Sequence, residues 1–147
     1  MTGTTTPVGV LEVRRSPGAL ELAVVGRVTG DVAEQTAAEL WTAVHAGRPF
    51  TVLYDRRRLT APTRAGRQAL AGWGEELLPA LGECCLAWAD VQDERRACSL
   101  RRAGYPDAPQ RSPYGYWVNR CTDVQEARAW LAAQRAERVR VRAASSA

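Results

Sequence analysis

Polar residues at the ends of apolar runs are the strongest candidates for chemistry in this chain. Asp55 follows the apolar run Phe50–Tyr54, and Asp90 and Asn119 stand at the ends of later runs. If these runs are neighbouring parallel strands, their carboxyl ends meet at one edge of a sheet, about 4.8 Å apart per strand. The two carboxylates could then perturb each other's pKa and act as an acid/base pair. The alternative is that they cap loops or pair with nearby arginines, and the local arginine density favours it. These arginines are Arg56, Arg57, Arg58, Arg95 and Arg96.

The densest charge run of the chain directly follows Asp55. Arg56, Arg57 and Arg58 precede Thr63, which has the residue type of a helix N-cap, and Arg64. The free amides of a helix N-terminus add to the attraction that arginines exert on an anion. The loop could therefore receive an anionic ligand or an acidic surface of a protein partner. The alternative is a solvated loop, as most short charge runs are.

Aromatic residues gather around a segment rich in proline, Tyr105–Pro113. Such a segment could form a lid over an apolar ligand, and Trp88, Tyr116 and Trp117 could line the pocket below it. The alternative is that these rings pack in the core, which the strand-like alternation around Tyr116 indicates for part of the group.

Several classes of site lack their signatures. The four cysteines, Cys84, Cys85, Cys98 and Cys121, contain no CxxC pair, and His45 is the only histidine, so neither a metal site nor a hydrolytic triad is predicted. No dinucleotide or phosphate-binding glycine motif is present, and we expect no cofactor.

Charge and hydropathy bound the class of protein. The chain has 147 residues and a net charge of +4, and all 20 of its basic residues are arginine. The surplus lies near the end of the sequence without interleaved aromatics, so nucleic-acid binding is not favoured. We find no apolar run long enough to cross a membrane and no signal peptide, and we expect a cytoplasmic protein.

The elements that position these residues follow from periodicity and turn chemistry. Strands and helices alternate after an opening hairpin, which predicts an α/β fold with a mostly parallel sheet, an N-terminal antiparallel hairpin and four helices. The helices are expected to begin at Asp31 (in a capping box with Glu34), Thr63, Gln92 and Asp123. The expected strands are Val10–Arg14, Ala19–Arg27, Phe50–Tyr54, Cys84–Val91 and Tyr114–Asn119.

Three stretches of the chain resemble the STAS superfamily, the fold of bacterial anti-sigma-factor antagonists, in its branch of lone actinobacterial STAS-like domains. They are LELAVVGRVTGDVAEQTAAEL, TVLYDRRRLTAPTRAGRQAL and CTDVQEARAWL, and the likeness spans about residues 8–133. The resemblance implies a STAS-like domain over residues 8–142, with flexible termini at 1–7 and 143–147.

One position departs from the pattern of that family. Anti-sigma-factor antagonists carry a phosphorylatable serine or threonine just before a glycine at the start of the second helix. Gly66 matches this glycine, but the preceding residue is Ala65, which has no hydroxyl. Thr63 is near enough to replace it, although an N-cap threonine is the simpler interpretation.

Two functions remain open from the sequence. The first is a non-enzymatic regulatory module that binds a protein partner or small ligand at the carboxyl-end edge of the sheet through the Arg56–Arg64 loop. Such a module could form a homodimer. The second is a cofactor-free cyclase or isomerase of bacterial specialised metabolism, with Asp55 or Asp90 as the catalytic carboxylate in an apolar pocket.

Overall fold

An antiparallel hairpin opens the fold. In the computed structural model, which describes residues 9–145, strands β1 (Val10–Ser16) and β2 (Ala19–Val25) pair along their full length. Gly18 turns the chain between them with φ +73°, a left-handed conformation that glycine adopts without steric cost. The structure thus confirms the opening antiparallel hairpin expected from the sequence.

The remaining strands extend β2 into one sheet. Strands β3 (Phe50–Asp55), β4 (Cys85–Val91) and β6 (Trp117–Cys121) run parallel to β2, and the order across the sheet is β1-β2-β3-β4-β6-β5. The short β5 (Gln110–Arg111) pairs antiparallel with β6 inside the proline-rich segment Tyr105–Pro113. Four parallel strands therefore end at the same edge, as predicted.

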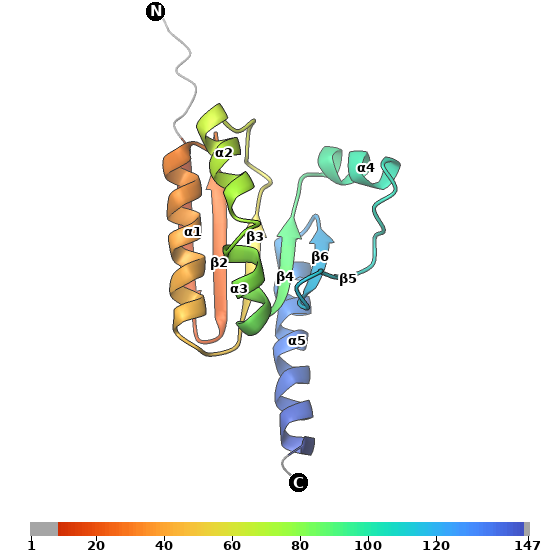
Figure 1. The fold of residues 1–147 in the computed structure, drawn as a ribbon. Helices are drawn as coiled ribbons and strands as arrows, with labels where there is room; N and C mark the ends of the chain where they lie inside the picture. Colours follow the sequence, from red (N-terminus) through yellow and green to blue (C-terminus); the bar gives the residue numbers. More distant parts are fainter. Residues whose placement is uncertain (1–8, 146–147) are drawn as a thin grey trace, which may run out of the picture.

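Helices cover the two faces of the sheet unequally (Figure 1). One face packs against α1 (Gly30–His45), α2 (Arg64–Gly72) and α3 (Leu77–Cys84), around a large core that includes the fully buried Leu22, Leu40 and Leu81. The other face carries a smaller core under α5 (Val124–Ser145). Helix α4 (Glu94–Arg102) has no buried residue and lies beyond the carboxyl ends of β4 and β6 (Figure 1).

The described residues contain five α-helices rather than four. The expected helix after Thr63 divides into α2 and α3, because a turn that contains Gly74 interrupts it after Gly72. Pro79 then falls in the first turn of α3, where its missing N–H leaves no hydrogen bond unmade.

The helix ends also differ in part from expectation. The N-cap of α1 is Thr29, whose hydroxyl accepts from the Val32 N–H at 3.2 Å, while Asp31 lies in the first turn. Asp123 caps α5 as predicted, since its Oδ1 accepts from two backbone N–H groups of the first turn. Residues 143–145, expected to be flexible, continue α5; residues 1–7 and 146–147 lie outside the described residues.

Candidate functional site

The carboxyl-end edge of the sheet places its two aspartates on opposite faces. Asp55 of β3 is in register with Val91 of β4, and Asp90 of β4 is in register with Tyr54 of β3. Because side chains alternate along a strand, Asp90 lies on the face of α1, α2 and α3, whereas Asp55 lies on the face of α5. The acid/base pair is therefore wrong: the two carboxylates share an edge but no site.

Asp90 holds Arg56 in a fixed position. The Arg56 Nε donates to Asp90 Oδ1 at 2.8 Å, and its Nη2 donates to Oδ2 at 2.5 Å. This bidentate pairing restrains the guanidinium. The guanidinium carbon also lies 5.9 Å from the centre of the Tyr54 ring. A third donor, Gln92 Nε2, reaches Asp90 Oδ2 at 3.1 Å. This network orders the first residue of the arginine run.

Asp55 makes a local pair instead. Its carboxylate accepts from the backbone N–H of Arg57 at 3.1 Å and from the Arg57 guanidinium at 3.0 and 2.9 Å. Burial alone would raise the pKa of Asp55, but the hydrogen bonds from Arg57 and the charges of Arg57 and Arg58 together hold this pKa below its usual value. Asp55 thus stays ionised and closes the turn that leaves β3.

The three consecutive arginines therefore do not form one cluster. Arg56 belongs to the face of α2, Arg57 turns back to Asp55, and Arg58 lies 3.1 Å from Glu12 of β1 in an exposed ion pair. Arg57 and Arg58 help to line a different pocket, of about 500 Å³, on the face of α5. The sequence prediction of a joint anion site for all three is not what the geometry supports.

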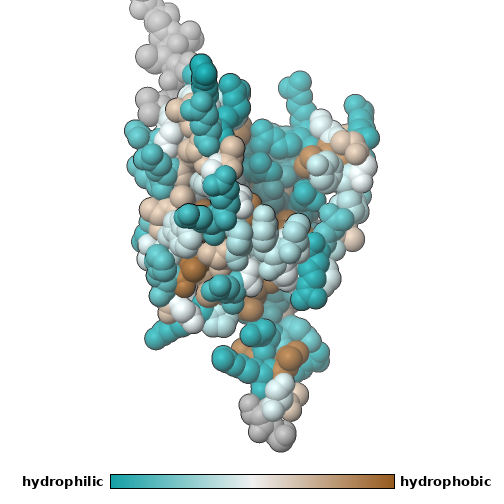
Figure 2. All heavy atoms as spheres, in the orientation of Figure 1, coloured by the Kyte–Doolittle hydropathy of each residue, from teal (hydrophilic) through white to brown (hydrophobic). Residues whose placement is uncertain are grey.

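A cleft of about 330 Å³ opens between α2, the loop after β3 and α4. Figure 2 shows the surface hollowed between α2 and α4. We call this the α2–α4 cleft. Its walls are mainly apolar or aromatic, and it contains two arginines; the lining residues are Val28, Tyr54, Leu59, Pro62, Leu70, Trp73, Arg56 and Arg96.

Arg96 is the second cation of this cleft. Its backbone N–H donates to the α4 N-cap Asp93 at 2.7 Å, so the residue is held at the start of the helix. Within residues 9–145, no carboxylate pairs with its half-buried guanidinium. The sequence offered Arg96 as a partner for Asp55 or Asp90, but Arg56 and Arg57 occupy those carboxylates.

Thr63 caps α2 at the rim of the cleft. Its hydroxyl accepts from the Gly66 N–H at 3.0 Å and donates to the Val28 carbonyl at 3.3 Å. A Cβ at Gly66 would lie only 1.9 Å from that same carbonyl oxygen, so glycine is required where α2 meets the chain after β2. The hydroxyl is thus engaged in the fold, and the N-cap prediction is confirmed. Arg64 is exposed beside it.

The predicted aromatic pocket does not form. Trp88 and Tyr116 belong to the core under α1, α2 and α3. Trp117, next in sequence, points to the opposite face in register with Ala87, and its ring lies 5.3 Å from the guanidinium carbon of Arg111. The three rings therefore do not enclose one cavity, contrary to what the enzyme interpretation requires.

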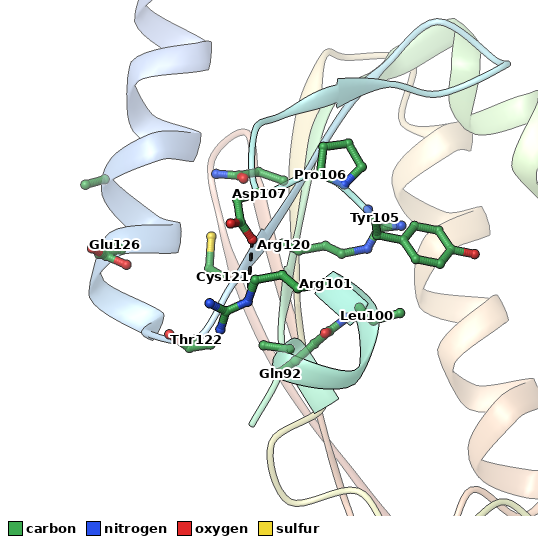
Figure 3. Close-up of a pocket in the computed structure, with 13 residues that line it drawn as sticks. Gln92, Leu100, Arg101, Tyr105, Pro106, Asp107, Arg120, Cys121, Thr122 and Glu126 are labelled. Carbon is green, nitrogen blue, oxygen red and sulfur yellow. Dashed lines mark ion pairs between the residues drawn. The ribbon is translucent and has the colours of Figure 1, made fainter. Parts of the chain in front are cut away.

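A second pocket, of about 540 Å³, lies at the same edge between α4, the end of β6 and the start of α5 (Figure 3). We call it the Gln92 pocket. It contains Asn119, which the sequence singled out, together with residues that it did not. These residues come from α4, the segment after it, the end of β6 and the start of α5: Gln92, Ala97, Leu100, Arg101, Tyr105, Pro106, Asp107, Arg120, Cys121, Thr122, Glu126 and Ala129.

Sequence reasoning missed Trp73 and Gln92 as lining residues. The helical spacing of Leu70 and Trp73 predicts an apolar stripe of α2 that faces the core; Trp73 does pack against that core, but it also lines the α2–α4 cleft. Gln92 follows Asp90 by two positions, the strand spacing that puts two side chains on one face. That spacing was the available signal for their hydrogen bond.

The described residues contain neither a group of three metal-ligating side chains nor a helix that is both long and apolar enough to cross a membrane. Burial raises the pKa of the Cys85 thiol to about 12, so this thiol stays protonated at neutral pH.

No family model matches the chain, and no curated protein matches it. Among solved structures, it is similar to an uncharacterized DUF3478-family protein with a SpoIIAA-like fold from Shewanella loihica, at 21% identity, TM-score 0.60 and coverage of 88% of this chain and 99% of that one. It is also similar to an anti-sigma factor antagonist from Mycobacterium paratuberculosis, at 16% identity, TM-score 0.49 and coverage of 84% and 94%. The first likeness confirms the fold expected from the sequence: the chain adopts the SpoIIAA-like, or STAS, fold.

Proposed function

We propose that this chain is a non-catalytic binding module that recognises an acidic segment of a protein partner at the α2–α4 cleft. The observation that carries the proposal is the pair of cations in one apolar-walled cleft. Arg56 is fixed by Asp90, and Arg96 has no anionic partner among residues 9–145. A guanidinium and a carboxylate attract each other more strongly when both are partly buried than when both are surrounded by water.

The surroundings of the cleft support an extended acidic segment over a single small ion. Arg64 and Arg67 are exposed on the first turns of α2, and Arg67 stands one turn before Leu70, a residue of the cleft wall. Leu70 and Trp73 offer an apolar surface beside the cations. A partner with alternating carboxylate and apolar side chains fits both features.

The state of the carboxylates supports binding rather than turnover. Asp55 and Asp90 are each paired with an arginine and lie on opposite faces, so neither is positioned as a free general acid or base in this cleft. The cyclase or isomerase interpretation therefore has less support than the binding module. Homodimer formation and a cytoplasmic location stay predictions from the sequence.

The experiment is an NMR titration of the full ¹⁵N-labelled chain with a synthetic peptide of alternating glutamate and leucine. We expect saturable shifts at residues 54–64 and 94–97, and none with the matched glutamine–leucine peptide. Arg96→Ala should weaken binding roughly 5- to 10-fold, because it removes the cleft cation that no carboxylate of residues 9–145 neutralises. Arg102→Ala, an exposed arginine of the same helix, is the matched control.

Two results would overturn the proposal. One is the absence of saturable shifts at the cleft with the acidic peptide. The other is an equal loss of affinity in Arg96→Ala and Arg102→Ala, which would show that net charge rather than the cleft attracts the peptide.

A further inference from the structure

The Gln92 pocket contains a buried side-chain amide oxygen. Gln92 is only 1% exposed, and its Oε1 has no hydrogen-bond partner within the described residues. Its Nε2 donates to Asp90 Oδ2. Because a carboxylate only accepts, the amide nitrogen must face Asp90, and the oxygen is fixed as the free atom. An acceptor left unpaired in this way costs free energy that a donor from a ligand would recover.

The charges around the pocket are of both signs, and two of them remain unmatched. Arg101 and Asp107 pair with each other at 3.6 Å. Arg120 lies over the Tyr105 ring, 4.8 Å from its centre, and within residues 9–145 it has no carboxylate partner; the Glu126 side chain likewise has no cationic partner there. Figure 3 shows Arg120 reaching from β6 toward Tyr105, with Glu126 on the opposite side, on α5.

The rest of the lining is partly apolar and also includes the polar side chains of Asn119 and Thr122. Ala97 and Leu100 of α4, Pro106 after it and Ala129 of α5 contribute carbon surface to the pocket. The volume of about 540 Å³ is within the range of small-molecule sites. A ligand that matches the free Gln92 oxygen, the two unmatched charges and the carbon surface carries one cationic donor, one anion and an apolar group.

We propose that the Gln92 pocket binds a small zwitterion of the amino-acid class with an apolar side chain. The ammonium group donates to Gln92 Oε1 and neutralises Glu126, the carboxylate pairs with Arg120, and the side chain lies against Leu100 and Ala129. This site is separate from the α2–α4 cleft and does not depend on the function proposed for it.

The test is an NMR titration of the full chain with L-leucine, L-methionine and L-phenylalanine, each added alone. We expect saturable shifts at pocket residues for at least one of them. Two derivatives of leucine serve as probes of the charges: 3-methylbutylamine lacks the carboxylate, and N-acetyl-L-leucine lacks the ammonium group. Both should bind at least about 10-fold more weakly than leucine, because each loses a charge-assisted hydrogen bond.

Two variants connect the binding to the residues. Gln92→Leu should weaken binding of the amino acid at least about 10-fold, and Gln35→Leu, the same change at an exposed position of α1, should leave it unchanged. Arg120→Gln changes a partly exposed residue and provides a second test if Gln92→Leu fails to fold. It should weaken leucine binding but not binding of 3-methylbutylamine.

The proposal fails if none of the three amino acids gives saturable shifts at the pocket. It also fails if N-acetyl-L-leucine binds as tightly as leucine, or if folded Gln92→Leu and Arg120→Gln both bind leucine like the parent protein.

Discussion

The two faces of the sheet use the same pair of residue types at the carboxyl-end edge for different purposes. On the face of α5, Asp55 binds Arg57 two residues later and only closes a turn. On the face of α2, Asp90 binds Arg56, which comes from a different strand end 34 residues earlier, and so fixes a cation beside a cleft. The same two residue types therefore close a turn when they are neighbours in sequence, and hold a cation at a cleft when they join two separate strand ends.

On the face of α2, we expect the largest loss of stability from a substitution of Gly66, where α2 approaches the chain after β2. Gly66→Ala places a Cβ 1.9 Å from the Val28 carbonyl oxygen, so helix or strand must shift. We expect a loss of roughly 2–3 kcal/mol in the free energy of unfolding, as for other overpacked sites. Urea unfolding measures it. Gly72→Ala, in the same helix with no atom within 4 Å of the added Cβ, is the matched control and should be neutral or slightly stabilising.

On the face of α5, we expect the contribution of Asp55 to the free energy of unfolding to depend on pH. Asp55→Asn removes the ionised acceptor of the Arg57 hydrogen bonds and should cost about 1–2 kcal/mol of unfolding free energy at pH 7. The folded-state pKa of Asp55 is depressed, so its contribution is present above the unfolded pKa of about 3.9 and is lost as pH falls through the lower folded value. The difference between variant and parent should therefore shrink below about pH 4.

Urea unfolding at a series of pH values checks this expectation. A difference between Asp55→Asn and the parent that stays constant, or that widens as pH falls below about 4, would contradict it.

The smallest effect is expected at the ion pair that ties α5 to β2. Arg128 donates to the Glu21 carboxylate at 2.8–3.3 Å, but both side chains keep contact with solvent. Arg128→Met should cost about 0.5–1 kcal/mol by thermal or urea unfolding. Arg138→Met, at an exposed position of the same helix, should change the stability by no more than about 0.5 kcal/mol. A loss above about 2 kcal/mol for Arg128→Met would mean that this face depends on the ion pair far more than we infer.

The shared edge of the strands was predictable because its signals are local. Apolar runs such as Phe50–Tyr54, the N-cap at Thr63 and the cap at Asp123 each depend on a few neighbouring residues, and the structure confirms them. The regular alternation of strands and helices then predicts a mostly parallel sheet.

The face of the sheet on which each side chain of this edge lies was not predictable, because it depends on the register between strands. The pairing of β3 with β4 shifts at Phe50 and Thr51, and a shift of one residue moves every later side chain to the other face. Asp55 is therefore in register with Val91 rather than with Asp90, and the two aspartates lie on opposite faces. The choice between Arg56 and Arg96 as partner of Asp90 is equally a matter of three-dimensional distance.

The Gln92 pocket depends on contacts between parts of the chain that are distant in sequence. The segment after α4 folds back over β6, where Tyr105 meets Arg120, and α5 adds Glu126 from the other side. No local pattern at Gln92 carries that information.

The most direct test of the contrast between the faces is fluorescence anisotropy of a labelled glutamate–leucine peptide with the full chain and two variants. Arg96→Ala alters the face of α2, and Arg128→Met alters the face of α5. The account predicts a loss of roughly 5- to 10-fold in affinity for Arg96→Ala and affinity within about 2-fold of the parent for folded Arg128→Met. A larger loss for Arg128→Met than for Arg96→Ala would place recognition on the opposite face and contradict the account.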